Sequence, residues 1–253
     1  MRLFVTPGWL KSISGNNIVP DIILDVRGLW VAYGATPILH GLDMTVQRGE
    51  IVGVIGRNGA GKTTLMRALI GLVRAMRGSI GLFDRDITGL SPDARARAGI
   101  GYVPQGRDVF PQMTVEENLE VGKLIGGPDA RKLPDLVYTY FPQLKARRRQ
   151  IAGTMSGGEQ QQLAIGRALI GNPVLMLLDE PSEGVQPSIV QMICEALKSI
   201  RHEIGTTIVF VEQNLDTILA IAERCYVMEK GRISTTLSED RIDADNVRTQ
   251  LLI

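Results

Sequence analysis

The sequence has almost no net charge and no long apolar run. Its 28 lysines and arginines stand against 27 aspartates and glutamates, which leaves a net charge of +1. Without a general basic field the chain has no broad attraction for a phosphate backbone, so we expect no nucleic-acid partner. The apolar stretches at 51–56 and 174–178 are far shorter than the ~20 residues that a membrane-spanning helix needs. If the protein serves a membrane, we expect another chain to span it.

Cysteine is scarce too, and the chain start lacks the pattern of a secretory signal. Cys194 and Cys225 stand in apolar surroundings without C-x-x-C or metal-like spacing. This favours buried free thiols in a reducing compartment over a disulfide. Only a short apolar stretch precedes Thr6, Pro7 and Gly8, so we expect no signal peptide. Residues 1–21, which are rich in glycine, proline and asparagine, are predicted to form a flexible leader.

From residue 22 onward, strand-like and helix-like segments alternate. A chain of 253 residues with 44% hydrophobic content allows one α/β domain, or a catalytic core with a smaller inserted subdomain. The alternation favours a sheet that contains parallel strands and is covered by helices. A helix after Gly61 should pack its apolar stripe on the sheet, and a hairpin should turn at Lys230–Gly231. That stripe is formed by Leu65, Ala68, Leu69 and Leu72.

Between residues 107 and 169 helical patterns predominate. Thr114 with Glu117 has the spacing of a capping box, in which side chains at a helix start bond each other's backbone, and an apolar stripe with Leu124 follows. Ser156 with Glu159 repeats this spacing. We therefore predict one domain over 22–253, with a helical subdomain at about 107–169 inserted into a core of about 22–106 and 170–253.

The segment at 56–63, GRNGAGKT, fits the phosphate-loop pattern G-x-x-x-x-G-K-[ST] and lies between a strand-like run and an amphipathic helix. Glycines let backbone N–H groups converge on phosphates, and the helix start adds a favourable dipole. Lys62 offers a charge to the phosphates and Thr63 a hydroxyl for Mg²⁺. The alternative, a chance match in a glycine-rich turn, fits the flanking elements poorly. The predicted ATP ligands here are Gly56, Asn58, Gly59, Ala60, Gly61, Lys62, Thr63 and Thr64.

A buried strand at 174–178 is followed directly by Asp179 and Glu180. Ligands of open α/β sheets bind at the carboxyl ends of the strands. We expect Asp179 to hold Mg²⁺ and Glu180 to act as the general base toward a water facing the γ-phosphate. Taken alone, the pair would favour a solvated acidic loop, but the phosphate loop upstream reverses this preference and favours the catalytic interpretation.

A second candidate anion site lies at Ser156, Gly157, Gly158 and Glu159, at a helix start that has no lysine. By itself such a cap is an ordinary structural feature. Together, however, SGGEQQ, GRNGAGKTT and LLDEP resemble the ATP-binding cassette (ABC) family, over nearly everything from Leu24 to Gly231. The resemblance implies an ABC ATPase fold: an α/β P-loop core with a mixed sheet, an N-terminal antiparallel β subdomain and an inserted helical subdomain.

The resemblance also implies a head-to-tail pair of cassettes, so that Ser156 and Gly158 contact ATP bound to the partner. Met155 departs from the leucine usual before this serine. Tyr33 matches the aromatic residue that stacks on adenine, and Gln105 matches the glutamine that reaches Mg²⁺ and the attacking water.

Residues 182–186 match the family's dimer-contact loop. Gln213 stands where most cassettes have a histidine that senses the γ-phosphate, and glutamine cannot carry that charge. Apolar residues after Gln105 are candidates for a groove that receives a permease helix, although Phe110 could equally belong to the core. These are Val109, Phe110 and Met113.

By resemblance, the chain is an ATPase subunit that binds ATP and Mg²⁺ at the cytoplasmic face of the inner or plasma membrane. The implied assembly adds a second cassette, two permease subunits and a substrate-binding protein. VEQN is similar to branched-chain amino acid and urea importers, and Gln105 with the loop after DEP looks closest to the urea type. The alternatives are an amino acid importer and a non-transport ABC ATPase, which normally has two cassettes. A non-hydrolysing module would lack Lys62 or Glu180.

Overall fold

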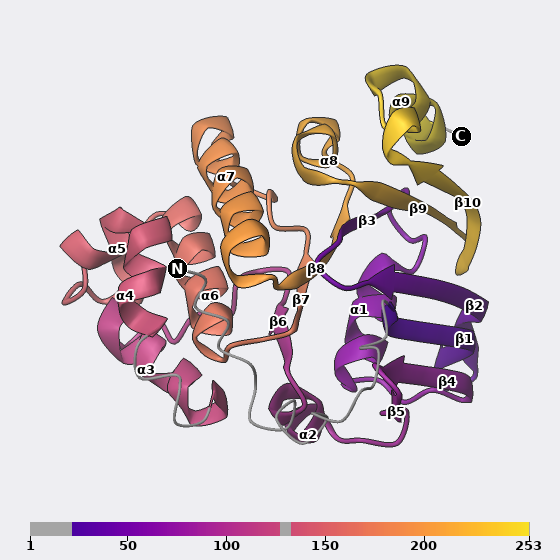
Figure 1. Cartoon of the computed structure of the whole chain (residues 1–253), viewed down its shortest axis with the longest axis horizontal. Coiled ribbons are helices and arrows are strands. Elements are labelled where there is room, and N and C mark those ends of the chain that lie inside the picture. Colours follow the sequence, from indigo (N-terminus) through magenta and orange to yellow (C-terminus); the bar gives the residue numbers. More distant parts are fainter. Residues whose placement is uncertain (1–21, 127–132, 253) are drawn as a thin grey trace, which may run out of the picture.

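A computed structural model describes residues 22–126 and 133–252, so the predicted leader at 1–21 lies outside the described residues. Two sheets lie side by side, with helices gathered mainly around the larger one (Figure 1). The smaller sheet is antiparallel, in the order β2-β1-β4-β5. Its strands are β1 (Ile22–Tyr33), β2 (Thr36–Gln47), β4 (Arg77–Leu82) and β5 (Arg85–Asp86).

The larger sheet is mixed and has the order β10-β9-β3-β8-β7-β6. Neighbouring strands from β9 to β6 run parallel, and only β10 pairs antiparallel, forming the predicted hairpin with β9. Every residue of β3, β7 and β8 is buried, as expected for parallel strands covered on both faces. The strands are β3 (Ile51–Ile55), β6 (Ile100–Val103), β7 (Leu175–Asp179), β8 (Thr207–Glu212), β9 (Arg224–Glu229) and β10 (Arg232–Ser238).

Helices α3 to α6 group beside the β6 edge of the larger sheet, opposite the antiparallel sheet (Figure 1). Both predicted capping boxes form, since the Thr114 and Ser156 side chains each accept from the backbone N–H of the matching glutamate. Among the described helices, none has the length and apolar content to cross a membrane. The helices are α1 (Lys62–Ile70), α2 (Pro92–Arg97), α3 (Val115–Gly126), α4 (Leu133–Tyr140), α5 (Pro142–Ala146), α6 (Gly157–Ile170), α7 (Pro187–Ile204), α8 (Leu215–Ile221) and α9 (Ala244–Leu252).

Alternate residues of the central strands supply two hydrophobic cores, one on each face of the sheet. Val52 and Val54 of β3 point to the core shared with α1 and the antiparallel sheet. Ile51 and Ile55 point to the core under α3, α4, α6, α7 and α8. The phosphate-loop helix and the helical group therefore pack on opposite faces of one sheet.

Two apolar residues do not pack as predicted. Helix α1 ends at the left-handed Gly71, so Leu72 falls beyond its last turn and is 57% exposed. Leu124 is 84% exposed on α3. The free-thiol prediction is confirmed: Cys194 and Cys225 are unpaired and buried, and burial raises the pKa of these thiols to about 11 and about 12.

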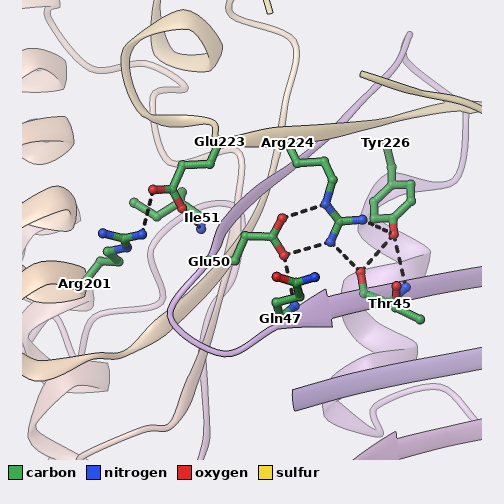
Figure 2. A network of polar contacts seen from close by, with 8 residues as sticks. All are labelled: Thr45, Gln47, Glu50, Ile51, Arg201, Glu223, Arg224 and Tyr226. Carbon is green, nitrogen blue, oxygen red and sulfur yellow. Dashed lines mark hydrogen bonds and ion pairs between the residues drawn. The ribbon is translucent and has the colours of Figure 1, made fainter. Parts of the chain in front are cut away.

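A polar network fastens the antiparallel sheet to the mixed sheet (Figure 2). The guanidinium of Arg224, on β9, donates to both carboxylate oxygens of Glu50 at 2.6 and 2.7 Å, just before β3. The same group donates to the Thr45 carbonyl of β2 at 2.9 Å, and the Tyr226 hydroxyl donates to that carbonyl at 2.8 Å. The network lies at the amino end of β3, away from the phosphate loop that follows its carboxyl end.

We expect Arg224→Ala to lower the free energy of unfolding by about 2–3 kcal/mol, because it strands the largely buried Glu50 carboxylate without its partner. Urea denaturation followed by circular dichroism measures the change. The control is Arg27→Ala, whose side chain is 76% exposed in its pair with Asp25 and whose loss should leave the unfolding midpoint unchanged. Equal shifts for the two variants would contradict this role of the network.

Candidate functional site

The phosphate loop connects β3 to α1 and is closely packed against β9. A Cβ atom at Gly56 would lie 2.3 Å from the Met228 carbonyl oxygen, so only glycine fits there. Gly61, the N-cap of α1, has φ 105°, a left-handed conformation that also favours glycine. The buried Lys62 folds back over the loop, and its Nζ donates to the carbonyls of Gly56 at 2.9 Å and Arg57 at 3.3 Å.

The structure brings the acidic pair to the phosphate loop. Asp179 is the last residue of β7, and its Oδ1 accepts a hydrogen bond of 3.1 Å from the Thr63 hydroxyl. Glu180 follows, with its Oε1 3.6 Å from Lys62 Nζ. Thr63 and Asp179, which are 116 positions apart in the chain, thus meet at the same edge of the sheet.

Glu180 adopts a left-handed backbone conformation, with φ 48°. Such a conformation is costly for a residue with a side chain and persists where the surroundings hold it, as at functional sites. Its backbone N–H donates to the Val211 carbonyl of β8 at 3.0 Å, which fixes the turn. The strained turn aims the side chain at Lys62 rather than along the strand.

Burial raises the pKa of the Asp179 and Glu180 carboxyl groups, although their polar partners lower it. For Asp179 the hydrogen bonds from Thr63 and Tyr102 lower the pKa, and for Glu180 the nearby Lys62 ammonium lowers it, but burial is the larger cause in each case. A carboxylate with a raised pKa is a stronger base near neutral pH. The shift of the Glu180 pKa is therefore in the direction that favours its predicted role as a general base.

The donor set here fits Mg²⁺. The Thr63 hydroxyl and the Asp179 carboxylate, already in contact, are hard oxygen ligands, and Mg²⁺ is usually held by one or two protein groups together with substrate phosphates. Among the described residues, no group of three or more histidine, cysteine or acidic residues is placed to hold a metal ion. Gln105, the third predicted ligand, bonds the loop that follows Glu180: its Nε2 donates to Glu183 Oε2 at 2.8 Å.

The Ser156 site is built as a complete helix cap. Glu159 Oε2 accepts from the Ser156 backbone N–H and hydroxyl at 2.9 and 2.8 Å, and Arg147 pairs with Glu159 Oε1 at 3.0 Å. Gly158 lies so close to Ile189 of α7 that an added Cβ would be 2.8 Å from its Cγ2. The start of α6 is therefore rigid, and its first turn presents backbone N–H groups.

Two further predicted residues lie at the edges of the site. Tyr33 ends β1, is 44% exposed and lies beside the guanidinium of Arg67 on α1, whose pKa it raises. Gln213 follows β8 and is exposed, while its backbone N–H donates to Glu212 Oε2 at 3.0 Å.

Sequence reasoning missed Glu212, a buried carboxylate that joins two loops of the site. One of its oxygens accepts from the Ser182 backbone N–H at 3.0 Å and hydroxyl at 2.5 Å. The other accepts from the backbone N–H groups of Gln213 and Asn214, each at 3.0 Å. An available signal was an acidic residue directly after the apolar run at 208–211, the same pattern that revealed Asp179.

The groove predicted from three apolar residues is only partly formed by them. A groove of about 360 Å³ lies between α2, α3 and α6, and Phe110 lines it with Arg167 stacked 4.9 Å from its ring centre. Val109 packs instead against the core, and Met113 is exposed outside the lining. Ile125 of α3 and Leu72 after α1 supply other apolar parts of this groove.

A phosphate loop beside an acidic strand end, on a mainly parallel sheet, defines the class of P-loop nucleotide-binding proteins. Residues 39–183 match the family model described as ABC transporter. The protein is 48% identical over 202 residues to the high-affinity branched-chain amino acid transport ATP-binding protein BraG of Pseudomonas aeruginosa, covering 79% of this chain and 86% of the relative. It is 34% identical to a probable branched-chain amino acid transport ATP-binding protein, LivF, of Archaeoglobus fulgidus, covering 80% and 86%.

Solved structures agree. A nucleotide-free ATP-binding cassette from an ABC transporter matches with a TM-score of 0.79 at 27% identity, covering 90% of this chain and 95% of that one. The ADP conformation of the cassette MJ1267 matches at 0.76 and 28% identity, covering 90% and 97%. The chain belongs to the ABC transporter family. It is the ATP-binding, ATP-hydrolysing subunit of such a transporter. The predicted α/β fold with a mixed sheet and antiparallel N-terminal strands is confirmed.

We expect Glu180→Gln to lower kcat for ATP hydrolysis by about 100-fold or more while ATP binding persists, because the amide cannot accept the proton of the attacking water. Phosphate release and fluorescent-nucleotide titration measure the two effects. Glu229→Gln, an exposed residue at the end of β9, is the control. Equal hydrolysis by Glu180→Gln and the parent protein would remove the general-base assignment.

Lys62→Ala should abolish hydrolysis and weaken ATP binding together, since it removes the ammonium that the loop already holds in place. The same two assays report the change. Lys123→Ala, in the exposed pair of α3, should behave like the parent protein. Normal turnover in Lys62→Ala would disprove the phosphate-loop assignment.

Proposed function

We propose that this protein energises a branched-chain amino acid importer by hydrolysing MgATP. The similarity to BraG, 48% identity across 79% of the chain, carries this proposal. The substrate itself would be selected by other subunits, because a cassette presents a nucleotide site rather than a site for the transported molecule.

In the proposed reaction, Lys62 exchanges its carbonyl acceptors for phosphate oxygens of ATP. Thr63 and Asp179 would hold Mg²⁺, which would neutralise charge on the phosphates when bound. Glu180 orients the attacking water and takes its proton. Gln105 leaves Glu183 to approach the same water, and Gln213 contributes a neutral hydrogen bond.

We propose that the ATP site is completed by a second cassette, which is arranged head to tail with this one. The second cassette is either a sister chain or another copy of this chain. The rigid start of α6 supports this arrangement, because it offers anion-binding N–H groups to a nucleotide held by the other chain. Tyr33 is exposed and can stack on adenine. The division into a core and a helical subdomain at about 107–169 belongs to the same proposal. The phosphate-facing residues are Gly56, Asn58, Gly59, Ala60, Gly61, Thr64, Ser156, Gly157, Gly158 and Glu159.

The groove between α2, α3 and α6 is the proposed docking site for one of two permease subunits at the cytoplasmic face of the membrane. It is apolar, and Phe110 and Ile125 are 42% and 48% exposed there. Exposed apolar patches of this kind mark interaction surfaces. A substrate-binding protein would act on the other side of the membrane.

Urea is the second candidate for the transported molecule. Two features favour urea. One is Gln105, where amino acid cassettes often have glutamate, and the other is the dimer-contact loop 182–186, which Gln105 contacts through Glu183. The sequence similarity favours branched-chain amino acids over this candidate.

Deleting the gene and measuring uptake of labelled leucine and labelled urea tests the function. We expect leucine uptake to fall to background and to return with the parent gene. Loss of urea uptake alone would favour the second candidate, and unchanged uptake of both, in cells without a redundant system, would contradict the importer role.

In the same complementation, Ile125→Asp should hydrolyse ATP normally but fail to restore uptake, because a charge in the groove opposes docking.

A further inference from the structure

Arg107 is a charged residue that no motif assigned, and it lies where three loops of the ATPase site meet. Its Nη2 donates to the backbone carbonyls of Glu183 at 3.0 Å and Gly184 at 3.2 Å, in the dimer-contact loop. Two residues earlier, Gln105 bonds the Glu183 side chain. The glutamine loop, residues 104–108, is therefore attached to the dimer-contact loop by both a side chain and backbone acceptors.

The third loop is the start of α6. An added Cβ at Gly157 would lie 2.8 Å from Arg107 Nη1 and 3.0 Å from its Cζ, so the guanidinium packs directly on this glycine. A cation gains nothing from the positive end of a helix dipole. Arg107 is therefore bonded to the carbonyls of Glu183 and Gly184 and contacts the start of α6 by packing alone.

The backbone at Arg107 is held in a costly conformation. Gly106, Arg107 and Asp108 have successive φ values of 86°, 74° and 46°, all left-handed. Two of these residues carry side chains, for which this region is unfavourable. On the far side, Arg167 of α6 donates to the Asp108 carbonyl at 2.6 Å. The segment is thus fixed by the dimer-contact loop at one point and by α6 at another.

The dimer-contact loop leads straight back to the candidate general base. The Glu183 backbone N–H donates to the Glu180 carbonyl at 3.1 Å, closing a turn that begins at Glu180. Glu212 holds this turn at Ser182, and Arg107 holds it at Glu183 and Gly184. Because Arg107 bonds the Glu183 and Gly184 carbonyls of this turn, the orientation of Glu180 depends on these hydrogen bonds.

We propose that Arg107 is a positioning residue that couples the start of α6, which would serve the partner's ATP, to the turn that carries Glu180 in its own site. This deepens the proposed function and rests on it. A shift of α6 on ATP binding moves Arg107, and Arg107 moves the Glu183–Gly184 carbonyls. A planar guanidinium suits this task, since one nitrogen can bond two carbonyls while another faces Gly157.

The test compares Arg107→Gln, Arg107→Lys and the exposed control Arg149→Gln in the full chain. We expect Arg107→Gln to lower kcat about tenfold, the effect of losing charged hydrogen bonds, while the Kd for ATP changes less than about twofold. Arg107→Lys should recover part of kcat, because an ammonium still reaches one carbonyl. Arg149→Gln should match the parent protein. Phosphate release, nucleotide titration and thermal unfolding supply the three measurements.

Each outcome decides the proposal. Unchanged kcat in Arg107→Gln would overturn it. A weakened Kd with kcat preserved would also overturn it and make Arg107 a nucleotide ligand. A lowered unfolding midpoint that accounts for the lost activity, with no recovery in Arg107→Lys, would reduce the residue to a structural role. Inactivity of the parent protein would instead count against the proposed ATPase function.

Discussion

The structure depends on holding two carboxylates, Asp179 and Glu180, in a buried position at the end of a strand. Burial disfavours their charged forms, so the surroundings must supply compensating donors. The Thr63 hydroxyl, which donates to Asp179, and the Lys62 ammonium, which pairs with Glu180, provide them. The phosphate loop is therefore a structural partner of the acidic pair before any nucleotide is present, and the two motifs cannot be placed independently.

The mixed sheet makes this arrangement possible because adjacent parallel strands end at the same edge. β3 delivers the phosphate loop, β7 the acidic pair and β8 the Glu212 carboxylate, and these strands are direct neighbours in the order β3-β8-β7. Helices on both faces bury the strands completely, so the polar chemistry is confined to the edge. At the opposite strand ends, Arg224 and Glu50 tie the antiparallel sheet to the mixed sheet.

Local patterns predicted much of this. The phosphate loop, the acidic pair and both capping boxes are contiguous in the chain, and each was expected from the spacing of its own residues. Arg107 and Glu212 were missed because their partners lie 76 and 30 residues away. Leu72 was misplaced because the position of the helix end at Gly71 depends on tertiary packing as well as on the apolar period. Gln105 was predicted to reach the metal and the attacking water; its amide bonds Glu183, and its role at the metal stays a prediction.

The hydrogen bonds of Lys62 to the carbonyls of its own loop have a thermodynamic consequence. A free lysine loses up to about 2 kcal/mol of side-chain conformational entropy when an anion immobilises it. Here the ammonium is already buried and held by Gly56 and Arg57, so most of that entropy is lost during folding. The contribution of this lysine to nucleotide affinity then depends on an exchange of acceptors, in which a phosphate oxygen replaces a carbonyl oxygen. The loop is preorganised, because the conformational entropy of its lysine is lost before the nucleotide binds.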